Sequence, residues 1–227
     1  IQHLVTNRVS TMAVNQCRYA LMCYEDGGIV DDLLIYKYSN EKFMLVVNAS
    51  NIGKDYEWIE SNLLSGATLT DISDGVSQIA LQGPLSRDIL GKIADLNLVP
   101  VKNYYFAENI NVGGINCLVS TTGYTGEAGY EFYVANEDAT KLYEKLLEAG
   151  EEFGVEPAGL GARDTLRFES SMPLYGHELT AETKANETGL DVFIKTELDF
   201  IGKNYIVNNP PKYARRGLVL IDRGIAR

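Results

Sequence analysis

Three apolar runs between residues 16 and 48 constrain the fold of this chain more than any other feature. The runs are rich in Tyr, Val, Ile and Leu, and the segments YEDGG and YSNEK separate them. Gly and Asn tolerate positive φ, so these two segments favour the tight turns that join neighbouring strands. The pattern therefore predicts an antiparallel meander over residues 16–48.

The second run contains two neighbouring acids, Asp31 and Asp32, in GGIVDDLLIYKY. Side chains on a strand alternate between faces, so Asp32 shares a face with Tyr36 while Asp31 points to the other face. Tyr19 and Asn48 are candidate neighbours on the adjacent strands. A carboxylate beside a phenol and an amide suits an N–H-rich heterocycle. Spacing alone leaves a second interpretation open, in which both acids only end a turn and flank an edge strand.

The rest of the chain mixes strand and helix patterns without regular βαβ alternation. This mixture favours an α+β fold with antiparallel sheets and flanking helices. The expected elements are a helix over 50–64, strands over 67–73 and 77–83, a helix with Pro84 at its first position, a hairpin over 108–120 that turns at Gly113 and Gly114, a strand over 130–135, a helix over 136–154 and a helix that starts at Pro157.

Composition and charge exclude several classes of function. A formal net charge of −11 argues against a nucleic-acid partner, because such binding depends on clustered Lys and Arg. No apolar run approaches the 18 residues of a membrane span. The three cysteines share no CxxC spacing and are expected to be buried free thiols, and with only two histidines no metal site is expected.

A glycine-rich stretch, TTGYTGEAGYEFYV, covers residues 121–134. Its glycines recur at every third position, which fits neither a dinucleotide-binding motif nor a phosphate-binding loop. The pattern indicates a sharp turn or a close backbone approach. Tyr124 lies in this loop and Glu131 begins the following strand.

The segment EPAGLGARDTLRFESSMPLYGHEL, over residues 156–179, contains two arginines one helical turn apart. Arg163 and Arg167 are therefore expected on one helix face, where they could clamp an anion. Asp164 and Glu169 lie close in sequence, so an internal ion-pair network is an equally open alternative. No catalytic triad or zinc-protease motif is present, which favours chemistry done by a bound cofactor-like molecule.

Seven short segments of the chain together resemble one known family, the T protein (aminomethyltransferase) of the glycine cleavage system. They are GGIVDDLLIYK, VVNASN, IALQGP, TTGYTGEAGYEFYV, PAGLGARDTLRFESSMPLYGHEL, ETGLDVFIK and FIGKNYI, in that order. Family members are longer at both ends, and this chain is expected to be a fragment that lacks both. The resemblance implies a ferredoxin-like family domain 2 over 1–73, the remainder of family domain 1 over 74–207, and a linker with the start of a truncated C-terminal β-barrel over 208–227.

The resemblance also implies an activity. Family enzymes take an aminomethyl group from the dihydrolipoyl arm of H protein, release ammonia and pass the one-carbon unit to tetrahydrofolate. A cytoplasmic location is implied for a bacterial protein and the mitochondrial matrix for a eukaryotic one. Two alternatives are a folate-binding protein of the same fold without transfer activity, and a folate-dependent demethylase that uses another donor.

Site residues follow from the same resemblance. Asp32 matches the essential aspartate of the family, which leaves Asp31 as the expected solvent or turn residue. Glu131 matches the glutamate that contacts the pterin. The other matches to the folate pocket are Tyr19, Tyr36, Asn48, Tyr124 and Arg163.

Overall fold

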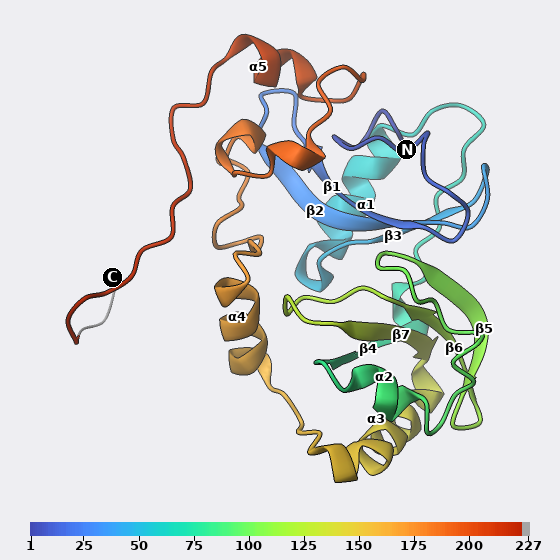
Figure 1. Cartoon of the computed structure of the whole chain (residues 1–227). Helices are drawn as coiled ribbons and strands as arrows, with labels where there is room; N and C mark the ends of the chain where they lie inside the picture. Colours follow the sequence, from blue (N-terminus) through green and yellow to red (C-terminus); the bar gives the residue numbers. More distant parts are fainter. Residues whose placement is uncertain (224–227) are drawn as a thin grey trace.

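The computed structural model describes residues 1–223, which form two antiparallel sheets, one above the other in the view of Figure 1. The predicted α+β class is confirmed, as is the predicted meander. The first sheet has the order β1-β2-β3, so the two acids lie on a central strand and the edge-strand interpretation is wrong. Its strands are β1 (Cys17–Cys23), β2 (Ile29–Lys37) and β3 (Phe43–Val46).

The second sheet has four strands in the order β4-β7-β6-β5. Its expected hairpin is confirmed, since Gly113 and Gly114 turn the chain with φ values of 57° and 90° that favour glycine. These strands are β4 (Val76–Gln82), β5 (Phe106–Val112), β6 (Ile115–Ser120) and β7 (Gly129–Ala135).

Helices cover the outer faces of both sheets (Figure 1). Ile59 of α1 packs into the core of the first sheet, while Leu142 and Leu146 of α3 pack onto the second. The helices are α1 (Ile52–Ser61), α2 (Ser86–Leu90), α3 (Asn136–Gly150), α4 (Leu160–Glu169) and α5 (Lys203–Asn208).

Four local expectations are wrong. Residues 67–73 form no strand, because this segment is largely exposed and no neighbouring strand pairs with it. Pro84 precedes a helix that begins only at Ser86, and α4 begins at Leu160 instead of Pro157. The helix predicted over 136–154 ends at Gly150, and a 3-10 turn carries the chain to Gly154.

The last third of the described chain returns to the first sheet. Leu179, Leu190 and Phe200 form one buried cluster with residues of β1 and β2. The division at residue 73 and its assignment to family domains stay a prediction. The buried cluster joins residues from both sides of that division. Residues 210–223 extend away from the rest without a helix or strand (Figure 1), and residues 224–227 of the expected barrel start lie outside the described part.

The cysteines are buried and unpaired, as expected. Burial raises the pKa of Cys23 to about 12, so its thiol stays protonated at neutral pH. Within residues 1–223, no helix is both long and apolar enough to cross a membrane.

The core of the second sheet gives a first prediction. Leu142→Ala should lower the free energy of unfolding by about 2–5 kcal/mol, because the fully buried side chain leaves a cavity between α3 and the sheet. Leu160→Ala is the matched control, since that side chain is 83% exposed and should change stability by no more than about 0.5 kcal/mol. Urea denaturation followed by circular dichroism measures both. Equal losses in the two variants would contradict the packing of α3.

Candidate functional site

The carboxylate of Asp32 lies on the face of the first sheet that turns toward the second sheet. Strand alternation places Tyr19 of β1 diagonally across from it. The Tyr19 hydroxyl donates to Oδ2 of Asp32 at 2.9 Å, and the Asn48 amide donates to Oδ1 at 2.9 Å. The structure thus brings these three predicted site residues into direct contact.

Asp31 is not a solvent or turn residue, and that expectation is wrong. It pairs with Met22 in the ladder of β1 and β2, and its side chain is fully buried. Its carboxylate accepts from the backbone N–H of Asn48 at 3.2 Å and from the Asn48 amide at 2.8 Å. The amide of Asn48 therefore bridges the two neighbouring acids.

The environment of Asp32 favours its protonated form. Burial raises the pKa of Asp32, and the nearby Asp31 carboxylate raises it further. The hydrogen bonds from Tyr19 and Asn48 act in the opposite direction and lower this pKa. A half-buried carboxyl group with a raised pKa can accept and hold a proton near its two fixed donors.

Tyr36 is fully buried between the two sheets, where it ends in a cluster of hydroxyl groups. Its hydroxyl lies 3.0 Å from Ser120 Oγ, 3.2 Å from Thr122 Oγ1 and 3.0 Å from the hydroxyl of Tyr133. Ser120 and Thr122 were not among the predicted site residues. Their two-residue spacing at the end of a strand, just before the glycine-rich loop, was the signal that could have found them.

Glu131 lies at the other end of this hydroxyl cluster. Thr122 donates a hydrogen bond to its Oε2, and the residue is buried with 8% exposure. Burial raises the pKa of Glu131, while the bond from Thr122 and the charge of Arg163 lower it. Tyr36 thus reaches Glu131 through Thr122.

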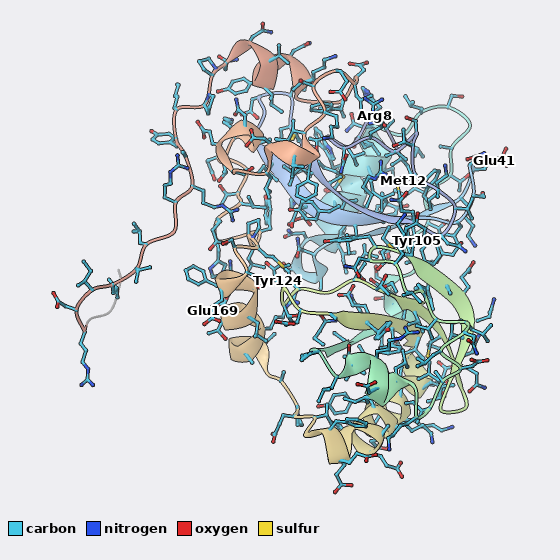
Figure 2. The ribbon with its side chains drawn as sticks, in the orientation of Figure 1. Arg8, Met12, Glu41, Tyr105, Tyr124 and Glu169 are labelled. Atoms are coloured by element: carbon cyan, nitrogen blue, oxygen red, sulfur yellow. The ribbon has the colours of Figure 1, made fainter. Side chains whose placement is uncertain are left out.

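Tyr124 and Arg163 approach from the glycine-rich loop and from α4. Figure 2 shows Tyr124 between the two sheets, beside α4. Its hydroxyl donates to the carbonyl of Pro173, and the guanidinium carbon of Arg163 lies 4.6 Å from the centre of its ring. Burial raises the pKa of Tyr124 to about 12; the charge of Arg167 lowers this pKa and the charge of Asp32 raises it.

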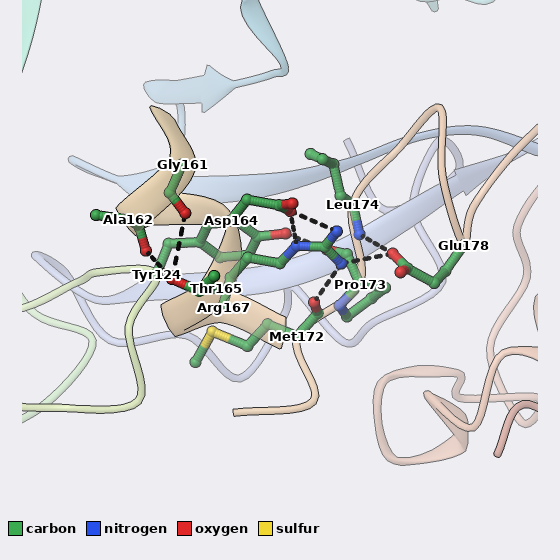
Figure 3. Close-up of polar contacts among 10 residues, drawn as sticks. All are labelled: Tyr124, Gly161, Ala162, Asp164, Thr165, Arg167, Met172, Pro173, Leu174 and Glu178. Atoms are coloured by element: carbon green, nitrogen blue, oxygen red, sulfur yellow. Dashed lines mark hydrogen bonds and ion pairs between the residues drawn. The ribbon is translucent and has the colours of Figure 1, made fainter. Parts of the chain in front are cut away.

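The two arginines of α4 have different environments. Arg167 is buried and forms ion pairs with Asp164 at 2.7 Å and with Glu178 at 2.6 Å (Figure 3). Arg163 is exposed and lies on the ring of Tyr124. The ion-pair alternative therefore holds for Arg167, with Glu178 in place of the expected Glu169, and only Arg163 is available to a ligand.

The glycine-rich loop is shaped by a close backbone approach, as its pattern indicates. A Cβ atom at Gly123 or at Gly129 would overlap the side chain of Gln82. That side chain donates to the carbonyls of Thr122 and Tyr130, both at 3.2 Å. Gln82 was missed at the sequence level, because no local pattern indicates that a β4 residue supports this loop.

A cavity of about 450 Å³ opens beside Tyr19, a volume within the range of small-molecule sites. Tyr104 and Phe193 supply aromatic walls, and Arg18 and Lys195 supply positive charge. In the part of the chain that the structure describes, no group of three His, Cys, Asp or Glu side chains is arranged to hold a metal ion.

The fold and the site together define a mixed α+β protein with two carboxyl groups, the half-buried Asp32 and the buried Glu131, in the region between its sheets. The sequence profile described as the GCVT N-terminal domain matches residues 1–198. The chain belongs to this family.

Similar proteins agree with that assignment. The chain is 47% identical to an aminomethyltransferase of Thermoanaerobacter pseudethanolicus and 50% identical to an aminomethyltransferase of Bacillus cereus, with all of this chain and 63% of each relative covered. The glycine cleavage system aminomethyltransferase T of Bartonella henselae has a similar structure, with a TM-score of 0.80 and 26% identity over 91% of this chain and 56% of that one. The chain spans less than two thirds of the length of these relatives.

The hydrogen bond between Tyr19 and Asp32 gives a second prediction. Tyr19→Phe should raise the pKa of Asp32 further, because this bond stabilises the ionised carboxylate. Tyr38→Phe is the control, since its hydroxyl contacts only the sulfur of Met44, at 3.7 Å. Carboxyl ¹³C NMR titration of protein labelled at aspartate measures both. An Asp32 pKa that is the same in Tyr19→Phe as in the unmodified protein would contradict the hydrogen bond between Tyr19 and Asp32.

Proposed function

We propose that this chain carries the transfer site of a tetrahydrofolate-dependent aminomethyltransferase of the glycine cleavage system. The reaction moves a one-carbon unit from aminomethyl-dihydrolipoyl H protein to tetrahydrofolate and releases ammonia. The observation that carries the proposal is the position of Asp32, held by Tyr19 and Asn48 in a chain of this family.

The residues fit a reduced pterin. A pterin presents an amino group and a ring N–H side by side, and a carboxylate can accept both. Glu131 offers such a carboxylate in a buried position, where a hydrogen bond to a ligand is not weakened by water. Tetrahydrofolate, when bound, supplies the ring nitrogen that takes the one-carbon unit.

Asp32 is assigned to charge stabilisation first and to proton transfer second. Tyr19 and Asn48 fix the direction of its carboxylate, so it needs no reorganisation when positive charge develops beside it. Its raised pKa suits a group that holds a proton from the attacking nitrogen or delivers one to the leaving amine.

Tyr124 and Arg163 are assigned to the outer part of the folate pocket. The exposed guanidinium of Arg163 can meet a carboxylate of folate and provides local positive charge in a chain of net charge −11. Tyr36 and Asn48 are the remaining residues assigned to the pocket. Tyr36 holds the hydroxyl cluster that reaches Glu131 through Thr122, and Asn48 orients Asp32. The lipoyl-carrying H protein is the proposed partner, and the implied compartment stays a prediction.

Substitution of Asp32 tests this function in the complete protein that contains these residues. Asp32→Asn should lower folate-dependent ammonia release from aminomethylated H protein by about 100-fold or more, because the amide can neither hold the proton nor stabilise positive charge. Asp88→Asn is the control, since Asp88 is exposed on α2. Ammonia release is measured in a coupled assay, and tetrahydrofolate binding by fluorescence titration.

The outcomes separate the alternatives. Folate binding without ammonia release from the unmodified protein would indicate a binding protein of the same fold. Transfer of a methyl group from an N-methyl amine to tetrahydrofolate, with 5-methyltetrahydrofolate and the demethylated amine as products, would indicate a demethylase. An active Asp32→Asn variant would remove Asp32 from the role assigned to it.

A further inference from the structure

A second pair of acids lies behind the site, on the helix side of the first sheet. Asp31 of β2 and Asp55 of α1 are both fully buried. Asp31 faces away from the second sheet, yet it touches the site through Asn48, from which it accepts two hydrogen bonds. Asp55 has no direct contact with Asp32, Tyr19 or Asn48 among the hydrogen bonds of residues 1–223.

The two oxygens of Asp55 are satisfied differently. Oδ1 accepts from the ammonium group of Lys54 at 2.6 Å, and that group also donates to the carbonyl of Val30. Oδ2 is buried and has no hydrogen-bond donor within the described residues. A buried carboxylate oxygen without a donor is costly, and a proton on it removes the cost if an acceptor is at hand.

Asp31 is the acceptor on this side of the sheet, because Lys54 joins Oδ1 of Asp55 to the carbonyl of Val30, the residue before Asp31, and both carboxyl groups are fully buried. Burial and the interaction with Asp31 raise the pKa of Asp55 to about 8, while Lys54 lowers it. Asp55 therefore keeps its proton at neutral pH and donates it toward the Asp31 carboxylate. The titratable groups around this pair are Lys54 from the same helix, Asp32 from β2 and Tyr175 from the segment after α4.

We propose that Asp55 and Asp31 share one proton, and that this pair positions Asn48 and, through it, the carboxylate of Asp32. Oδ1 of Asp31 accepts one amide hydrogen of Asn48 at 2.8 Å, so the other hydrogen points to Asp32 at 2.9 Å. A flipped amide would place its oxygen against two carboxylates, which is unfavourable. The shared proton limits the charge behind the site to one, because two adjacent buried carboxylates cannot both stay ionised.

Burial of these two carboxyl groups lowers the free energy of unfolding, and their presence despite this cost supports a role beyond folding. Apolar side chains of similar volume would fill the interface between α1 and β2 without desolvating charge. The consequence for Asp32 rests on the proposed function, whereas the shared proton does not. Asp31 and Asp55 are positioning residues, since neither is placed against the ligand.

Two variants of Asp55 in the complete protein test the inference. Asp55→Asn retains an N–H donor to Asp31 and should keep kcat within about threefold of the unmodified protein. Asp55→Leu keeps the number and branching of the side-chain heavy atoms but has no donor, and it should lower kcat about tenfold or more while the KM for tetrahydrofolate changes by less than about threefold. Equal kcat losses in both variants, or no loss in Asp55→Leu, would overturn the positioning role.

NMR provides a readout that does not depend on activity. The ¹³C carboxyl signal of Asp55 should titrate near pH 8 and disappear in Asp55→Asn, and the side-chain amide signals of Asn48 should shift in Asp55→Leu but stay in place in Asp55→Asn. An Asp55 signal that titrates near pH 4 would overturn the shared proton. Absence of ammonia release from the unmodified protein would refute the proposed function alone and leave this result standing.

Discussion

The hydroxyl group of Tyr36 is the contact on which the arrangement of the site depends. It is buried between the sheets and meets Ser120, Thr122 and Tyr133, so it joins the central strand of the first sheet to the second sheet. Thr122 continues from it to Glu131. An aromatic ring with a polar end suits this position, because its body fills the core while its hydroxyl satisfies the polar groups there. Tyr36 and Thr122 thus link the strand that carries Asp32 to Glu131.

Strand alternation made the first sheet and its central acid predictable. The turn residues around YEDGG fixed the meander, and the two-residue period placed Asp32 on the same face as Tyr36. Strand alternation could not predict which face of the sheet would be exposed to solvent. Asp31 was expected to be a solvent or turn residue, but α1 covers that face. The packing of a helix that begins 21 residues further along the chain does not alter the two-residue period of the strand.

Other features were unpredictable because they depend on contacts between distant segments. The pattern over 67–73 suggested a strand, yet a strand needs a hydrogen-bonded neighbour, and within residues 1–223 no strand pairs with this segment. Gln82 supports the glycine-rich loop from 40 residues away, and Glu178 takes the place expected for Glu169 beside Arg167. Helix periodicity identified the shared face of Arg163 and Arg167, but only tertiary packing decided which of them is buried.

Desolvation is the largest cause of the raised pKa at Asp32, at Glu131 and at Asp55. Carboxyl groups that lose water bind a proton more tightly than they do in solvent, which lowers the cost of bringing three of them together in an acidic chain. The hydrogen bonds from Tyr19 and Asn48 act in the opposite direction and lower the pKa of Asp32. Asp32 is half-buried, so a ligand that excludes the remaining water raises this pKa further. Proton binding at Asp32 therefore depends on whether the site is occupied, because burial is the largest cause of the shift.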